Sequence, residues 1–351
     1  MHKRFEHSIG TCHLALKQMK RLQRSQPELG ISDRDVRNVA IAGLCHDLGH
    51  GPFSHTFDSL IAEHQMTSQG LPADQCWHHE VASVMMLHDI LESHPGLRKQ
   101  VSLAEEKLIS DLIMGNSNER QWICEIISNS RNGIDVDKFD YMMRDTQKAN
   151  MNFSSFNQDK VMRGARVINN QICYPEKDAY ELKKLFDSRY NLYKDCYLHR
   201  VTQAYECLLF DILKAAWGTL DLISAITDPC KYVELDDSIL HEIRLSTSPE
   251  MELARQLLAR FDSRHHYSFV AEKVLTKKIK VSAQEVCQYK RPQDSLSEDD
   301  IRIKQFNINM GMKEVNPLAH VSFYKTCDQG KAIELVHKSM NEISTMMPER
   351  F

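Results

Sequence analysis

Residues 42–55 read Ala-Gly-Leu-Cys-His-Asp-Leu-Gly-His-Gly-Pro-Phe-Ser-His, and this stretch places an imidazole directly beside a carboxylate. The pair is His46-Asp47, and two further histidines, His50 and His55, follow within nine positions. Such groups cost free energy among apolar residues unless something binds to them. The stretch therefore predicts a bound divalent metal ion.

The apolar pattern before this pair is that of a helix. Apolar residues repeat at helical spacing over 36–44, and Ser32 with Asp35 three positions later is a capping-box signature. Gly49 follows directly and is typical of a helix end. The predicted ligand pair at His46 thus lies at the C-terminal end of a helix.

The same patterns extend along the chain and predict a mostly α fold, a helical bundle with a small mixed α/β C-terminal lobe. We expect one further helix near the N-terminus, where residues 5–16 carry an apolar stripe. Other helices are expected at 79–94, 103–114, 120–130, 137–146 and 178–217, and short strands at 167–174, 301–308 and 320–326.

Composition along the chain suggests how it is divided. We expect a catalytic core over residues 1–217 and, over 218–351, a helical extension with a small mixed lobe that serves regulation or oligomerisation. Residues 275–300 are rich in Lys, Gln, Asp and Ser, which predicts a mobile loop. The abrupt start of the first helix suggests that a longer protein has a region upstream.

The overall composition excludes several classes of protein. Of the 351 residues, 42% are hydrophobic and 26% charged, which is ordinary for a globular protein and excludes disordered and fibrous ones. With 44 basic and 48 acidic residues the formal net charge is -4, so a nucleic-acid surface has to be a local patch. Ten cysteines without a CxxC pair or a preceding signal peptide indicate reduced intracellular thiols. No apolar run approaches the length of a membrane span.

A metal site needs ligands from several parts of the chain. Imidazole with carboxylate suits zinc, iron or manganese, whereas an all-oxygen set suits magnesium or calcium. Beside His46 and Asp47, His7 can supply a second imidazole and Asp137 a second carboxylate from other helices. Taken alone, His7 also fits a surface histidine, and Asp137 fits an acid at a helix N-terminus.

Together, the chain's motifs resemble a known family. The strings are Arg4-Phe-Glu-His7, residues 46–55, His79-Glu80, residues 131–145, Arg189, Tyr197-Leu-His199, residues 312–324 and residues 348–351. They resemble the HD-domain phosphohydrolases and, within them, the SAM-and-HD-domain deoxynucleoside triphosphate triphosphohydrolases. The resemblance implies an HD-domain helical bundle that lacks the SAM domain and the segment before the first catalytic helix.

The resemblance also implies a reaction. His7, His46, Asp47 and Asp137 would hold one transition metal, zinc, iron or manganese, while Mg²⁺ would be shared with the substrate phosphates. The metal lowers the pKa of bound water, and the resulting hydroxide attacks the α-phosphorus of a deoxynucleoside triphosphate (dNTP). The products would be the deoxynucleoside and inorganic triphosphate.

Breaking the bond to the sugar 5′-oxygen requires a proton donor. We assign this role to His55, with Asp58 one helical turn on to orient or charge it. His50 and His79 would contact phosphate oxygens or take part in proton transfer, with Glu80 supporting them. A purely structural hydrogen-bonding role for His55 is the alternative.

A triphosphate carries about four negative charges, so cations should converge on it. By resemblance these are Arg4, Lys138 and Arg189, with Tyr141 as a hydroxyl donor. On composition alone each cation would be a solvated surface charge.

The resemblance assigns three more residues to the nucleoside. Tyr197 would stack beneath the sugar and exclude a ribonucleotide 2′-hydroxyl, and Asp145 would bond the 3′-hydroxyl. Tyr193 stands near the base, where the family has a histidine. Core packing and a surface salt bridge are the alternatives for Tyr197 and Asp145.

The family is activated by nucleotides. The resemblance implies a pocket for GTP or dGTP and dNTP activators, assembly into a dimer or tetramer, and location in the nucleus, with the cytosol as the alternative. Single-stranded nucleic acid is a further expected partner, and control of dNTP pools would restrict viruses and influence DNA repair and replication. The activator residues would be Lys160, Lys177, His199, Arg200 and Arg264.

Two other functions fit the same residues. The chain could be a catalytically impaired regulator that binds nucleotides or single-stranded nucleic acid, or an HD-type phosphatase of nucleoside monophosphates. The predicted cluster of Arg4, Lys138 and Arg189 favours a longer phosphate chain than a monophosphate.

Overall fold

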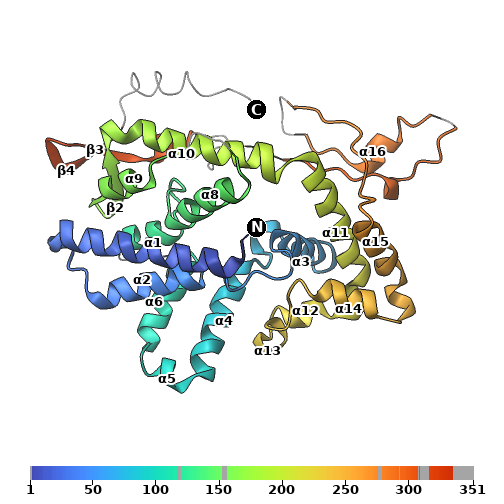
Figure 1. Ribbon diagram of the computed structural model, residues 1–351, viewed down its shortest axis with the longest axis horizontal. Coiled ribbons are helices and arrows are strands. Elements are labelled where there is room, and N and C mark those ends of the chain that lie inside the picture. Colours follow the sequence, from blue (N-terminus) through green and yellow to red (C-terminus); the bar gives the residue numbers. More distant parts are fainter. Residues whose placement is uncertain are drawn as a thin grey trace.

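Two N-terminal helices, α1 (Arg4–Ser25) and α2 (Asp33–Cys45), pack against each other in the computed structural model (Figure 1). The predicted capping box of α2 is confirmed. The Ser32 hydroxyl accepts from the amide of Asp35 at 3.1 Å, and the Asp35 carboxylate accepts from the amide of Ser32 at 2.9 Å. The two helices approach closely at Gly43, where a Cβ would lie 3.2 Å from the carbonyl oxygen of Thr11.

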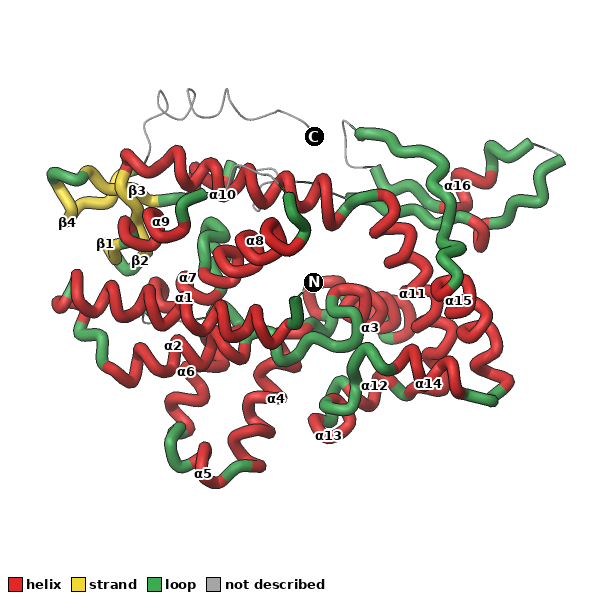
Figure 2. The backbone as a smooth tube through the Cα atoms, in the orientation of Figure 1, coloured by secondary structure: helices red, strands yellow, loops and turns green. Residues whose placement is uncertain are grey.

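The structure describes residues 2–116, 120–151, 156–275, 279–291, 293–306, 308 and 316–334. After α2, the α-helices are α3 (His55–Ser68), α4 (His79–Ser93), α5 (Pro95–Arg98), α6 (Leu103–Ile113), α7 (Gln121–Ile127), α8 (Val136–Lys148), α9 (Gln158–Gly164), α10 (Ala179–Leu192), α11 (Arg200–Leu220), α12 (Leu222–Ala225), α13 (Pro229–Tyr232), α14 (Ile239–Leu245), α15 (Glu252–Asp262) and α16 (Ala283–Cys287). The mostly α fold predicted from the sequence is confirmed (Figure 2).

A small mixed sheet of strand order β1-β2-β3-β4 lies at one end of the molecule (Figure 2). β1 pairs antiparallel with β2, β2 parallel with β3, and β3 antiparallel with β4. The sheet thus joins chain segments from both sides of the domain boundary expected at residue 217, and that boundary itself stays a prediction. The strands are β1 (Arg166–Ile168), β2 (Gln171–Pro175), β3 (Ser322–Lys325) and β4 (Asp328–Ile333).

Two expectations about strands were wrong. The segment 167–174 is a hairpin rather than one strand, because Asn169 and Asn170 adopt φ of 52° and 59°, as a tight hairpin turn requires. The segment 301–308 contains no strand among its described residues. In this segment the guanidinium of Arg302 donates to the carboxylate of Asp211. This side-chain hydrogen bond holds the segment against α11 in place of backbone pairing with another strand.

The helix predicted over 178–217 is interrupted. α10 ends at Leu192, a π-helical turn, η4 (Tyr193–Tyr197), follows, and α11 begins at Arg200. Figure 1 shows α10 crossing the top of the molecule and α11 descending from its end. Single π-helical turns are frequent at functional sites.

The apolar side chains form two main buried clusters. The larger one combines side chains from α1, α2, α4 and α6 to α10 with Phe323 of β3. The second combines α3 and α4 with α11 to α15. The predicted catalytic pair His46-Asp47 follows α2 and precedes α3, so it lies in the chain between the two clusters.

Other segments complete the description. Of the loop expected over 275–300, the described residues include α16 and the short helix η6 (Glu298–Asp300), and its mobility stays a prediction. Residues 312–315 and 348–351, which carry part of the family resemblance, lie outside the described residues. Among the described helices, none has the length and apolar character that crossing a membrane requires.

Gly49 tests how tightly the chain after α2 is packed. A Cβ at this position would lie 2.1 Å from the carbonyl oxygen of His79 and 2.2 Å from the amide nitrogen of Ser83, both backbone atoms of α4 that cannot rotate away. We expect Gly49→Ala to lower the free energy of unfolding by about 3 kcal/mol in urea titrations.

The matched control is Gly218→Ala. Gly218 is an exposed helical residue of α11 with no atom within 4 Å of an added Cβ. This variant should be up to about 1 kcal/mol more stable than the parent, because alanine favours helix over glycine. Equal unfolding midpoints for the two variants would contradict the close packing at Gly49.

Candidate metal centre and active site

Three helices bring the predicted metal ligands together. His7 lies in α1, His46 and Asp47 directly follow α2, and Asp137 lies in the first turn of α8. One donor atom from each of His7, His46 and Asp137 lies within 4.8 Å of the others. The fold therefore brings together His7 and Asp137, which are 130 positions apart in the sequence.

The distances show that the four side chains face one point. Nε2 of His7 is 3.1 Å from Oδ1 of Asp137, and Nε2 of His46 is 3.4 Å from the same oxygen. Asp47 places Oδ1 3.3 Å from Nε2 of His46 and Oδ2 3.6 Å from Nε2 of His7. Two nitrogens and carboxylate oxygens in this arrangement suit a divalent transition metal.

Hydrogen bonds through Nδ1 fix the orientation of both imidazoles. Nδ1 of His7 donates to Asp140 at 2.7 Å, and Nδ1 of His46 donates to the carbonyl oxygen of Gly43 at 2.9 Å. With Nδ1 engaged in these bonds, Nε2 is the nitrogen of each imidazole that faces the cluster and is placed to bind a metal. Nε2 of His46 is buried and makes no hydrogen bond within the described part of the chain, which fits an atom reserved for a ligand.

The carboxylates of the cluster favour a positive charge at its centre. Burial by itself would lower the pKa of His7, but hydrogen bonds with Asp137 and Asp140 outweigh it and raise that pKa to about 9. For Asp137 burial would raise the pKa, yet the two histidines hold it well below its ordinary value. The group thus stabilises a cation between the carboxylates, either a proton or a metal ion.

Arg4, a predicted phosphate ligand, lies at the edge of this cluster. Its guanidinium contacts the carboxylate of Asp47 and the hydroxyl of Ser54. Its side chain is 39% exposed, so the guanidinium borders both the metal ligands and solvent. The phosphate-binding role assigned to Arg4 stays a prediction.

The predicted acid and its neighbours form a second cluster beside the first. His50, His55, Asp58 and His79 each place one donor atom within 4.8 Å of the others. Asp58 lies 3.3 Å from Nδ1 of His55 and 2.8 Å from Nδ1 of His79, so one carboxylate orients two imidazoles. Its hydrogen bond raises the pKa of His55, as a proton donor near neutral pH requires.

His50 and Glu80 occupy different surroundings. Burial lowers the pKa of His50 to about 3, so this imidazole is neutral, and its ring stacks on that of His79 with centroids 3.7 Å apart. The carboxylate of Glu80 lies 2.7 Å from Nδ1 of His78 and 3.5 Å from Nδ1 of His79. Glu80 thus contacts the second cluster through His79.

The other predicted phosphate ligands lie on α8 and α10. Lys138 donates to Asp135 at 2.9 Å. Burial by itself would lower the pKa of Lys138, but the carboxylates of Asp135 and Asp137 outweigh burial and raise it. Burial holds the pKa of Tyr141 well above its ordinary value, so its hydroxyl stays a donor. The guanidinium of Arg189 lies 4.3 Å from the ring centroid of Tyr193.

The predicted nucleoside residues also meet. The hydroxyl of Tyr197 donates to Asp145, and the rings of Tyr193 and Tyr197 lie edge to face with centroids 5.1 Å apart. The π-helical turn η4 carries both tyrosines. Their roles in recognising a sugar and a base stay predictions.

The predicted activator residues make local contacts. Lys160 lies 3.0 Å from Asp178, Nδ1 of His199 accepts from an amide at the start of α11, and the guanidinium of Arg200 lies 5.7 Å from the ring of Phe269. Lys177 is in a short helix before α10, and Arg264 follows α15 with φ of 60°. The activator pocket stays a prediction.

Sequence reasoning missed several residues that hold the site. Asp140 orients His7 and is itself bonded by Arg144 at 2.9 Å, and its position one helical turn after Asp137 was the available signal. The Ser83 hydroxyl accepts from the amide of Gly49 and donates to the carbonyl of His46, at 2.8 and 2.7 Å. No sequence pattern marks this serine.

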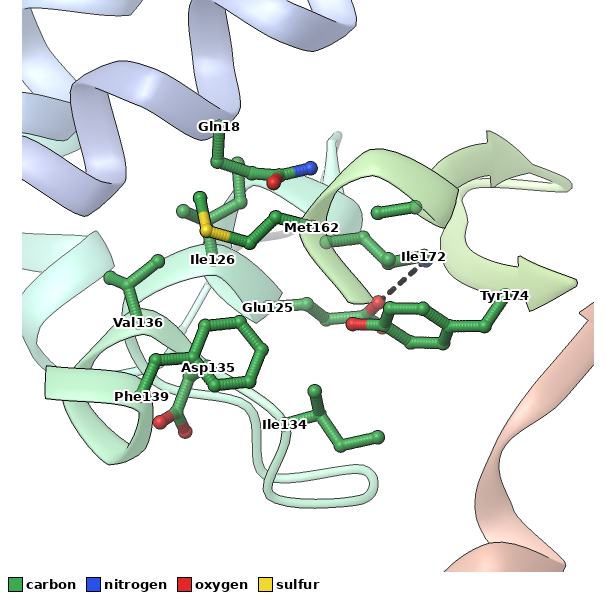
Figure 3. A pocket seen from close by; sticks show the side chains of 11 residues that line it. Gln18, Glu125, Ile126, Ile134, Asp135, Val136, Phe139, Met162, Ile172 and Tyr174 are labelled. Atoms are coloured by element: carbon green, nitrogen blue, oxygen red, sulfur yellow. Dashed lines mark hydrogen bonds between the residues drawn. The ribbon is translucent and has the colours of Figure 1, made fainter. Parts of the chain in front are cut away.

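Two hollows elsewhere do not contain the metal ligands. A cavity of about 10 Å³ lies in the core between α7, α8 and β2, where the carboxylate of Glu125 accepts from the amide of Ile172 at 2.7 Å (Figure 3). It is large enough for about one water molecule. A groove of about 970 Å³ between α1 and α8 is lined by Asp140 and Arg144 but not by His46 or Asp47. The ligand geometry, rather than a hollow, thus marks the candidate site.

The chain is similar to known proteins. The HD domain model matches residues 4–147, which contain all four predicted metal ligands. The deoxynucleoside triphosphate triphosphohydrolase SAMHD1 homolog of Dictyostelium discoideum is 36% identical to this chain. The proteins named deoxynucleoside triphosphate triphosphohydrolase SAMHD1 in Bos taurus and Homo sapiens are 35% and 33% identical to it. Each of the three alignments covers 100% of this chain. The chain spans 66%, 65% and 61% of their respective lengths, slightly less than two thirds.

A viral protein extends the comparison. The putative HD domain-containing protein L394 of Acanthamoeba polyphaga mimivirus is 31% identical over 70% of the chain. Together with the HD match and the similarity to animal and amoebal proteins over the whole chain, this shows that the chain belongs to the HD-domain family of SAMHD1 and its relatives.

Proposed function

We propose that this chain hydrolyses deoxynucleoside triphosphates to deoxynucleosides and inorganic triphosphate. The observation that carries the proposal is the convergence of His7, His46, Asp47 and Asp137 next to a second cluster that contains His55. The names of the relatives support the choice of substrate. The cations at Lys138 and Arg189 supply charge for a long phosphate chain.

The ligand geometry fits a transition metal better than magnesium. A metal bound between the carboxylates would lower the pKa of water and polarise a phosphate oxygen. Within the protein, Asp140 and the Gly43 carbonyl hold the two imidazoles so that each Nε2 faces that position. Which metal the protein uses, zinc, iron or manganese, and a role for magnesium stay predictions.

The second cluster supplies the proton for the leaving group. His55 is exposed to solvent over 81% of its side chain, while its Nδ1 is held by Asp58. In this role the imidazolium transfers its proton to the departing sugar 5′-oxygen, and Asp58 stabilises the charged ring before transfer. His79 bonds to the same carboxylate and fixes its orientation.

The finer consequences of the family likeness are part of the proposal. Activation by GTP or dGTP, assembly into dimers or tetramers, binding of single-stranded nucleic acid, nuclear location and restriction of viruses rest on the resemblance.

Product analysis tests the reaction. We expect the purified protein, given dATP with Mg²⁺ and Mn²⁺ or Fe²⁺, to release inorganic triphosphate, and His46→Gln to lose both turnover and the transition metal held with His7 and Asp137. His88→Gln is the matched control, because His88 lies in another group of potential ligands that is mostly exposed. Release of orthophosphate would favour a phosphatase, and binding without turnover a regulator.

Substitution of His55 tests the acid. We expect His55→Gln to lower kcat about 10²- to 10⁴-fold, because a general acid contributes roughly that much, with KM for dATP nearly unchanged. Metal content at the first cluster should stay at the parent level. A variant with parental kcat would exclude His55 as the proton donor.

Substitution of Tyr197 tests sugar selectivity. Removing its ring in Tyr197→Ala should lower the ratio of kcat/KM for dATP over ATP by about tenfold or more, since steric exclusion of the 2′-hydroxyl is lost. Tyr180→Ala, at a position 55% exposed on α10, should keep the parental ratio. If the Tyr197 variant still ignored ATP, another residue would have to exclude ribonucleotides.

A further inference from the structure

The second histidine cluster has the composition of a metal site in its own right. Three imidazoles and one carboxylate, from His50, His55, Asp58 and His79, place donor atoms within 4.8 Å of one another. This ligand set is typical of zinc and similar transition metals, and it is poorly suited to magnesium. The cluster stands beside the first metal centre, and Nε2 of His50 lies 3.6 Å from Asp47.

Three of these four ligands lie at the N-termini of two helices. His55 and Asp58 belong to the first turn of α3, and His79 is the first residue of α4. Asp58 lies 2.8 Å from Nδ1 of His79 and 3.3 Å from Nδ1 of His55. Ligands about 2 Å from a tetrahedral metal ion lie about 3.3 Å from each other, so a shared cation could replace these hydrogen bonds with little movement.

Polar atoms in the cluster still lack partners. Nδ1 of His50 and Oδ1 of Asp58 are buried and make no hydrogen bond within the described part of the chain. The side chain of His50 is only 5% exposed, so water does not readily satisfy it. Buried polar atoms of this kind cost free energy, and a bound ion offsets that cost when it supplies the missing contact.

Exposure to solvent is uneven across the cluster. His55 exposes 81% of its side chain, whereas His79 and Asp58 expose 16% and 18%. An ion can thus enter past His55 and be held by the three deeper groups. The third group of potential ligands, around His88, lacks this depth, and its Glu106 already contacts Arg98.

We propose that His50, His55, Asp58 and His79 bind a second divalent transition metal ion, and that its binding inhibits the hydrolase. The inhibitory consequence rests on the function proposed above. On binding, the imidazolium of His55 releases its proton to solvent and its nitrogen lone pair coordinates the ion. The residue then has no proton to give to the leaving 5′-oxygen until the ion dissociates.

Metal stoichiometry tests the site without any activity measurement. Metal-free protein is dialysed against buffered Zn²⁺, and bound zinc is measured by mass spectrometry. We expect two ions per chain, with His46→Gln retaining the ion of the second cluster. In His55→Gln the Kd of the second ion should rise at least about tenfold, since even outer partners of a metal site contribute that much.

Controls keep this test decisive. His55 is largely exposed, so its substitution carries little risk of unfolding, and His79→Gln serves as a second variant for the same cluster. His88→Gln should bind two ions with parental affinity. A parent that binds a single ion, or a second ion whose Kd is the same in the parent and both cluster variants, would overturn the proposed site.

Turnover tests the inhibition separately. With dATP and Mn²⁺, Zn²⁺ at concentrations that fill the second site should slow triphosphate release in proportion to its occupancy, and a chelator that removes only the weaker ion should restore the rate. Full activity at full occupancy would overturn the inhibitory role. If the parent never releases triphosphate, the proposed function fails while dialysis still decides whether the second site exists.

Discussion

The balance of charge where α1, α2 and α8 meet is the constraint on which the rest of the structure depends. Three aspartates, Asp47, Asp137 and Asp140, surround two buried imidazoles, so the space between them favours a cation. Helix packing alone would not require this arrangement. The close approach at Gly43, the turn after α2 and the start of α8 all serve to bring these charges within contact.

The second cluster depends on the first for its position. Ser83 of α4 bridges the amide of Gly49 and the carbonyl of His46, so the helix that carries His79 is tied to the end of α2. Phe53 and Ser54 then adopt φ of 58° and 53°, an uncommon conformation outside glycine. Backbone strain next to an active site is usual, because positioning of the side chains outweighs the local cost.

The sequence allowed much of this to be predicted, and the limits have physical reasons. The pair His46-Asp47 could be recognised as metal ligands because its two donor groups are adjacent in the sequence. The start of α2 could be predicted because its capping box is formed by residues three positions apart. The hairpin within 167–174 and the π-helical turn η4 were missed, because apolar spacing does not report a two-residue turn or one extra residue in a helix turn. Ser83 was missed because its bonds are made across the fold to backbone atoms.

One further feature concerns the order in which the protein folds. The carbonyl of Gly49 accepts from the hydroxyl of Tyr232 at 2.6 Å, and the amide of Phe53 donates to Asp237 at 2.9 Å. These partners are 183 and 184 residues apart, so the turn that carries His50 gains its last bonds only after the segment beyond α11 has been synthesised. A nascent chain can therefore complete the helices that carry His7 and Asp137 well before the turn between the two histidine clusters is secured.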